Sequence, residues 1–190
     1  MYHHKHGKAR GQAKMKQNGK SVSAMGNEKR NLYSRQQLTK ALLKLLKKKE
    51  LADITVSELC EEAGVGRVTF YRNYPDMKDI VRQFLLEDNR EWTETILTDD
   101  VPFNEKFRRI FRHFEDNRKV YEILNRRGLT DLLQDVITSA WKLKLDGSLA
   151  EAYSSAYLMY LVYGFIEVWF RRGMIDSSEE MAVLLSAVGK

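Results

Sequence analysis

Apolar residues recur three and four positions apart through most of this 190-residue chain, which is the spacing of one face of an α-helix. No segment shows the apolar–polar alternation of a half-buried strand, and the two prolines, Pro75 and Pro102, both suit the start of a helix. The pattern therefore predicts an all-α fold. Its expected inward faces are Leu38, Leu42, Leu45 and Leu46; Val56, Leu59, Cys60 and Ala63; Ile80, Val81, Phe84 and Leu85; Phe103, Phe107, Ile110 and Phe114; and Leu132, Leu133, Val136, Ile137 and Ala140.

Four helix starts are marked by a serine or threonine that is followed three residues later by Glu or Gln. In this capping-box spacing the first side chain accepts a hydrogen bond from a backbone N–H, and the fourth residue reaches back to the first. The pairs are Ser34–Gln37, Thr55–Glu58, Ser148–Glu151 and Ser177–Glu180. They predict a first helix from about residue 34, a second from 55, a long one over about 148–172 and a last one from about 177.

The composition narrows the class of protein. A hydrophobic content of 43% can fill a core, and the longest apolar stretch, residues 156–166, is too short to cross a bilayer. The N-terminus lacks the apolar segment of a signal peptide, and Cys60 is the single cysteine. We expect a cytoplasmic protein without membrane partners, in which Cys60 is a small buried core residue rather than a redox switch.

The positive charge is concentrated at the front of the chain. Residues 1–24 hold six basic and no acidic side chains, residues 28–80 hold 11 basic and 8 acidic, and residues 81–190 hold 15 basic and 18 acidic. This division is expected if only the front of the molecule meets a polyanion. We interpret residues 1–30 as a flexible basic tail, and the alternative is a basic arm that lies along DNA.

The stretch "ITVSELCEEAGVGRVTFYRNYPDMKDI", residues 54–80, reads as two short helices joined by a tight turn. Thr55 caps the first helix, Ala63 ends it, and Gly64 can take the left-handed conformation that stops a helix at low cost. Two helices joined so closely form a helix-turn-helix. The second helix carries side chains suited to bases and phosphates in the major groove, namely Arg67, Val68, Thr69, Tyr71, Arg72 and Asn73. An ordinary helical hairpin with exposed basic residues is the alternative.

Three apolar residues of the same stretch are expected to pack inward and hold the angle between the two helices. They are Val65, Phe70 and Tyr74.

From about Leu38 to Ile80 the sequence strongly resembles the TetR family of bacterial regulators. The resemblance is carried by the stretch quoted above, by its "TFYRNY" segment and by the preceding "ALLKLLKKKELADI". It implies a DNA-binding domain over 31–80 and a larger helical domain over 81–190 that dimerises and usually holds an effector. The positions where family members usually touch DNA are Thr55, Arg67, Val68, Tyr71, Arg72 and Asn73.

The sequence departs from the family pattern at the start of the fourth helix. Members commonly have a lysine at the position of Met77, against a DNA phosphate, whereas here the lysine follows at Lys78. One residue is a turn of roughly 100° around a helix. The phosphate contact is therefore either lost or made by Lys78, which we include among the expected DNA-binding residues.

The segment "AYLMYLVYGFIEVWFRRGM", residues 156–174, is apolar on nearly every side, so it has to be buried on all sides. We expect a homodimer through this helix and the one after it, with Gly164 allowing close approach. The "YGFIEVWFRRGM" part resembles a TetR subgroup that includes regulators of dihydroxyacetone kinase operons.

An effector pocket is expected between about Phe103 and Phe170, lined by Phe111, His113, Tyr121, Trp141, Tyr157, Tyr160 and Glu167, although these residues suit core or interface equally well.

The leading functional hypothesis is a homodimeric repressor that binds a double-stranded DNA operator and is released by a small-molecule effector. An enzyme is disfavoured because the sequence lacks a metal-ligand cluster, a phosphate-binding glycine loop and a nucleophile motif, and it offers only His113 outside the tail as a base. No catalytic residue, metal or cofactor is expected. The third hypothesis is a TetR-like coactivator that acts through another protein, which the Met77 departure keeps open.

Overall fold

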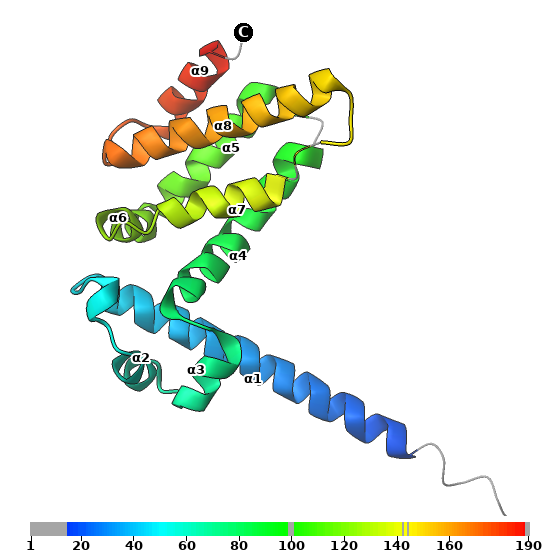
Figure 1. The fold of residues 1–190 in the computed structure, drawn as a ribbon, viewed down its shortest axis with the longest axis vertical. Coiled ribbons are helices and arrows are strands. Elements are labelled where there is room, and N and C mark those ends of the chain that lie inside the picture. The colour runs from blue at the N-terminus through cyan, green and yellow to red at the C-terminus, as the bar shows by residue number, and fades with distance from the viewer. Residues whose placement is uncertain (1–14, 99–100, 142, 144, 189–190) are drawn as a thin grey trace, which may run out of the picture.

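The computed structural model describes residues 15–98, 101–141, 143 and 145–188. These residues form helices and connecting loops without a β-strand (Figure 1), so the predicted all-α fold is confirmed. Among the described helices, none combines the length and the hydropathy that a membrane-spanning segment needs. In chain order the elements are α1 (Met15–Leu46), the 3-10 turn η1 (Leu51–Asp53), α2 (Val56–Ala63), α3 (Arg67–Asn73), α4 (Met77–Thr98), α5 (Phe103–Asp116), α6 (Arg118–Arg126), α7 (Asp131–Trp141), α8 (Leu149–Arg171) and α9 (Ser178–Val188).

The N-terminal end of the molecule is a three-helix unit in which α2 and α3 pack against the C-terminal half of α1 (Figure 1). The predicted leucine face of α1 is buried at Leu38, Leu42 and Leu46. Leu59 of α2 and Phe70 of α3 meet this face and are fully buried. Burial of apolar surface therefore holds the short helices in place, since helices of this length are marginal in isolation.

The first helix begins earlier than the sequence predicted. Ser34 does not cap a helix start but lies inside α1, where its hydroxyl donates to the carbonyl of Arg30 at 2.9 Å. Residues 15–30 therefore belong to α1 rather than to a flexible tail, and residues 1–14 lie outside the described residues. The physical reason is that a helix anchored by tertiary packing extends one hydrogen bond per residue without a new nucleation cost, even where it has no apolar face.

The other three predicted caps are confirmed. Thr55 Oγ1 accepts from the N–H of Glu58 at 3.2 Å. Before α8, Ser148 accepts from the N–H of Glu151 at 3.3 Å and the Glu151 carboxylate accepts from the N–H of Ser148 at 2.9 Å. The Ser177–Glu180 pair repeats this reciprocal pattern before α9. Each cap satisfies backbone donors that the helix leaves free, and so sets where the helix begins.

The larger unit is built around α5, which packs along α9, while α7 packs along α4. Its core is aromatic: the ring of Phe114 lies 4.7 Å from that of Tyr121 and 5.3 Å from that of Phe170, and Phe111 lies 5.3 Å from Trp169. The α4 helix (green in Figure 1) starts at the three-helix unit and runs into the larger one. It is thus the covalent link between the two.

Candidate nucleic-acid interface

The turn between α2 and α3 consists of Gly64, Val65 and Gly66, and it has the predicted geometry. Gly64 takes the left-handed conformation with φ 64° and ψ 32°, and its N–H donates to the carbonyl of Cys60. The N–H of Val65 reaches the same carbonyl at 3.0 Å. These bonds satisfy the last carbonyls of α2, and a residue with a side chain at Gly64 would be strained by the positive φ.

One side of α3 is exposed and carries four side chains, which we call the recognition face: Arg67, Val68, Tyr71 and Arg72. Val68 is 80% exposed and Tyr71 is 62% exposed, although both are large apolar or aromatic residues. The four positions cover an arc of roughly 140° around the helix. The recognition face therefore offers two guanidinium groups, one methyl pair and one phenol to the same partner, which suits guanine edges, thymine methyls and phosphates.

Three other predicted contact residues are placed differently. Thr69 and Asn73 lie half-buried on the side of α3 away from the recognition face, and Asn73 Nδ2 donates to the carbonyl of Thr69 at 2.7 Å. Thr55 is exposed at the start of α2, with its hydroxyl oxygen engaged in the cap. The structure thus gathers four of the predicted residues on one face, while Thr69 and Asn73 lie on the other side of α3 and Thr55 lies at the start of α2.

The orientation of α3 is held from its buried side. Phe70 is fully buried and Tyr74 is 2% exposed, as predicted, and Val65 is half-buried. Arg35 of α1 donates from Nε to the hydroxyl of Tyr74 at 3.3 Å and pairs with the carboxylate of Glu87 on α4 at 2.6 Å. The sequence carries no local signal for Arg35, because its partners lie 39 and 52 residues away in the chain.

At the start of α4 the side chains of Met77 and Lys78 point to different surroundings. Met77 is half-buried and packs against the hydrophobic core, whereas Lys78 is exposed. Asp76 precedes the helix and its carboxylate accepts from the N–H of Asp79 at 2.8 Å. The exposed cation at this helix start is therefore Lys78, on the same end of the molecule as the recognition face.

Two lysine–glutamate ion pairs lie within this unit. Lys44 and Lys49 of α1 and the loop after it pair with Glu62 and Glu58 of α2, at 2.5 and 2.7 Å. Cys60 is 4% exposed, and burial raises the pKa of its thiol. The prediction of Cys60 as a core residue is confirmed.

Comparison with known proteins identifies the two units. Residues 38–84 match a family described as bacterial regulatory proteins of the tetR family, and residues 103–189 match one described as a transcriptional regulator C-terminal region. The chain belongs to the TetR family of bacterial transcriptional regulators. It is a DNA-binding regulator, and the helix-turn-helix just described lies inside the N-terminal match.

The fold of this TetR regulator is shared by a solved relative. The crystal structure of a TetR transcriptional regulator from Streptococcus agalactiae 2603V superposes with a TM-score of 0.60 at 18% sequence identity. The match covers 87% of this chain and 98% of that one. No curated protein matches the chain. At this identity the likeness establishes the fold alone.

The pockets between the described residues do not gather the seven residues predicted to line an effector pocket. Phe111, Tyr121 and Trp141 are buried in the close-packed core, whereas Tyr157 and Tyr160 of α8 are more than half exposed. The lining of an effector pocket by these residues therefore stays a prediction, because aromatic periodicity does not tell which side of a helix faces its neighbours.

Two polar members of the set, His113 and Tyr121, take part in one part-buried network. His113 Nε2 lies 2.9 Å from the carboxylate of Asp88, and the hydroxyl of Tyr121 donates to the same oxygen at 2.6 Å. Asn89 Nδ2 donates to the hydroxyl of Tyr121 at 3.1 Å. Burial and the charge of Asp88 raise the pKa of Tyr121 well above its usual range. This network joins α4 to α5 and α6.

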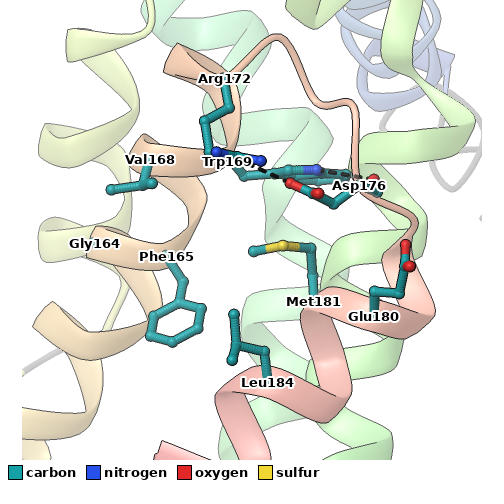
Figure 2. A pocket seen from close by; sticks show the side chains of 9 residues that line it. All are labelled: Gly164, Phe165, Val168, Trp169, Arg172, Asp176, Glu180, Met181 and Leu184. Atoms are coloured by element: carbon teal, nitrogen blue, oxygen red, sulfur yellow. Dashed lines mark hydrogen bonds and ion pairs between the residues drawn. The ribbon is translucent and has the colours of Figure 1, made fainter.

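A groove of about 470 Å³ lies between α8 and α9 (Figure 2). Trp169 lies in it with its Nε1 donating to the carbonyl of Asp176 at 3.1 Å, while Phe165, Met181 and Leu184 form apolar walls. None of the seven predicted pocket residues lines this groove.

A smaller cavity of about 160 Å³ lies beside the turn that joins α6 to α7. Glu167, the one predicted residue on its wall, pairs with Arg171 at 2.7 Å. The other polar lining residues are Asn125, Thr130, Asp131 and Tyr163.

Proposed function

We propose that this protein is a homodimeric repressor that binds operator DNA through the recognition face and is released by a small-molecule effector. The observation that carries the DNA part of the proposal is the contrast on α3. Four side chains that suit bases and phosphates are exposed together, while Phe70 on the opposite side is fully buried and fixes the helix. We expect the protein to act in the cytoplasm, where it binds the DNA upstream of its own gene.

A gel-shift experiment with the DNA upstream of the protein's own gene tests this proposal. Arg67→Ala removes a base contact and should relax the preference at one operator position, at a cost of roughly 1–3 kcal/mol per site. Tyr71→Phe removes only a hydroxyl that meets a phosphate, so it should weaken all sequences alike. A protein that binds no DNA in this assay, but captures another regulator, would instead support the coactivator hypothesis.

The placement of Lys78 makes a second prediction about DNA binding. Because Lys78 is exposed and Met77 packs against the core, we expect Lys78 to serve the phosphate. Lys78→Ala should weaken binding to every sequence and lower the salt slope by about one unit per half-site. Met77→Lys should have little effect on either the DNA affinity or the salt slope. If the Lys78 variant keeps the affinity and salt slope of the parent, α4 does not approach the DNA backbone.

The homodimer is proposed through α8 and α9. The outer side of α8 exposes Tyr153, Tyr157, Tyr160 and Val168, and α9 exposes Val183, Leu184 and Val188. Exposed aromatic and aliphatic side chains gathered on two helices suit an interface, and a two-fold dimer presents two recognition helices to half-sites about 34 Å or somewhat more apart.

Sedimentation velocity tests the dimer. The protein should sediment as a dimer at micromolar concentration, and Val168→Glu should shift it to monomer because the charge is buried without a partner. Gln134→Glu, which adds the same charge at an exposed position on α7, is the control and should leave the dimer intact. A monomeric parent protein would overturn the proposal.

We propose the small cavity beside the α6–α7 turn as the effector site. Its size and its carboxylate, amide and hydroxyl lining suit a small polar compound. A compound that releases the DNA should act more weakly on the Asp131→Ala protein, and an unchanged response would place the effector elsewhere. The resemblance of residues 163–174 to regulators of dihydroxyacetone kinase operons stays a hypothesis about the subgroup.

A further inference from the structure

Arg127 connects the larger helical unit to the helix-turn-helix unit. It follows the last residue of α6, and its Nε donates to the backbone carbonyl of Leu46 at 2.7 Å. Its Nη1 pairs with the carboxylate of Glu50. Leu46 is the last residue of α1, and Glu50 lies in the loop that leads to α2. One guanidinium group thus binds two points of the other unit, 81 and 77 residues away in the chain.

The surroundings of Arg127 fix both the position and the direction of its guanidinium group. The Arg127 side chain is only 13% exposed, so solvent competes little for its donors. The carbonyls at the end of α1 have no partner within the helix, and a cation there interacts favourably with the negative end of the helix dipole. A planar guanidinium that holds both a carbonyl and a carboxylate fixes direction as well as distance.

The contact is placed where it can set the angle of the recognition helix. The α1 helix carries α2 and α3 on its C-terminal half, so its end is rigidly related to the recognition face. The two units are joined covalently through α4, whose N-terminal part also contacts α1. Contacts between α1 and α6 provide a second, non-covalent point of attachment.

We infer that Arg127 is a positioning residue that fixes the orientation of the helix-turn-helix relative to the larger unit, and thereby the spacing of the two recognition helices in a dimer. The inference rests on the proposed function in one respect: Gly128, with φ 63°, and Thr130 of the next turn line the cavity proposed for the effector. An occupant that shifts this turn moves Arg127 away from Leu46.

Distance measurements between spin labels test the positioning directly. Labels at Ser57→Cys on α2 and Gln134→Cys on α7, both exposed positions, report the relation of the two units, and the native Cys60 is buried. Labelled chain is diluted with unlabelled chain, so that distances within one chain dominate. Arg127→Gln should broaden and shift the distance distribution. Arg126→Gln, the same change at the exposed preceding residue, should leave it unchanged.

DNA binding is measured on the same proteins with the fragment from upstream of the gene. If only about a tenth of the molecules keep the competent orientation, Arg127→Gln weakens binding about tenfold. Arg126→Gln removes an equal charge and should stay within about twofold of the parent. A fall in affinity for Arg127→Gln without any change in the distance distribution overturns the inference, as does a distribution identical to that of Arg126→Gln.

The two proposals fail separately, because the distance measurement needs no DNA. A parent protein that ignores the fragment, but whose distances respond to Arg127→Gln, counts against the proposed function and supports the positioning role. If Arg127→Gln does not fold, Arg127→Lys gives the same readout, since an ammonium group is a point charge that lacks the planar fork.

Discussion

Replacing Phe70 by alanine is expected to abolish DNA binding while the larger helical unit stays folded. The Phe70 side chain is fully buried between α1, α2 and α3, and its ring lies 5.1 Å from that of Tyr71. Deleting a buried phenyl ring costs roughly 3–5 kcal/mol, which is a large share of the stability of a small three-helix unit. The recognition face then loses the support that orients it. Helix content by circular dichroism and binding to the upstream fragment measure the two effects.

The control for Phe70→Ala is Val68→Ala on the same helix. Val68 is 80% exposed, so its loss should change the free energy of unfolding by no more than about 0.5 kcal/mol. Its DNA affinity should still fall, because Val68 belongs to the recognition face. A Phe70→Ala protein that binds DNA like the parent would show that α3 is not held from its buried side.

The second large effect is expected at Trp169, which joins α8 to the loop before α9. The side chain is fully buried, packs edge-to-face on Phe111 at 5.3 Å and donates from Nε1 to the carbonyl of Asp176. Trp169→Ala should lower the free energy of unfolding by roughly 3–5 kcal/mol. The same substitution should also weaken the dimer, because α9 loses part of its packing against α8. Urea unfolding and sedimentation velocity are the measurements.

Two further variants separate packing from hydrogen bonding at this position. Trp169→Phe keeps an aromatic ring and loses the N–H, so its cost should approach the 0.5–1.5 kcal/mol of one hydrogen bond, plus a small cavity. Ile175→Ala, at a position 70% exposed in the same loop, should be close to neutral. A Trp169→Ala protein as stable as the Ile175→Ala protein would contradict the role given to this residue.

The sequence by itself determined the features that depend on neighbouring residues. The Thr55, Ser148 and Ser177 caps act over three residues, and Gly64 acts through its own φ, so both could be predicted without knowledge of the fold. The recognition face was predictable for a similar reason. On a helix as short as α3, the inward position of Phe70 leaves Arg67, Val68, Tyr71 and Arg72 on the other side.

Only the tertiary structure decided which side chains from distant segments meet. Ser34 matches a cap but lies inside a helix, because packing of the leucine face anchors α1 and lets it extend towards Met15. His113 and Tyr121 look like pocket residues in sequence, yet Asp88 of α4 engages both. Arg127 has no local signal, because its partners at Leu46 and Glu50 come close only when α6 packs against α1. Local hydrogen bonds are set by a few neighbouring residues, whereas these contacts depend on how helices pack, which is a property of the whole chain.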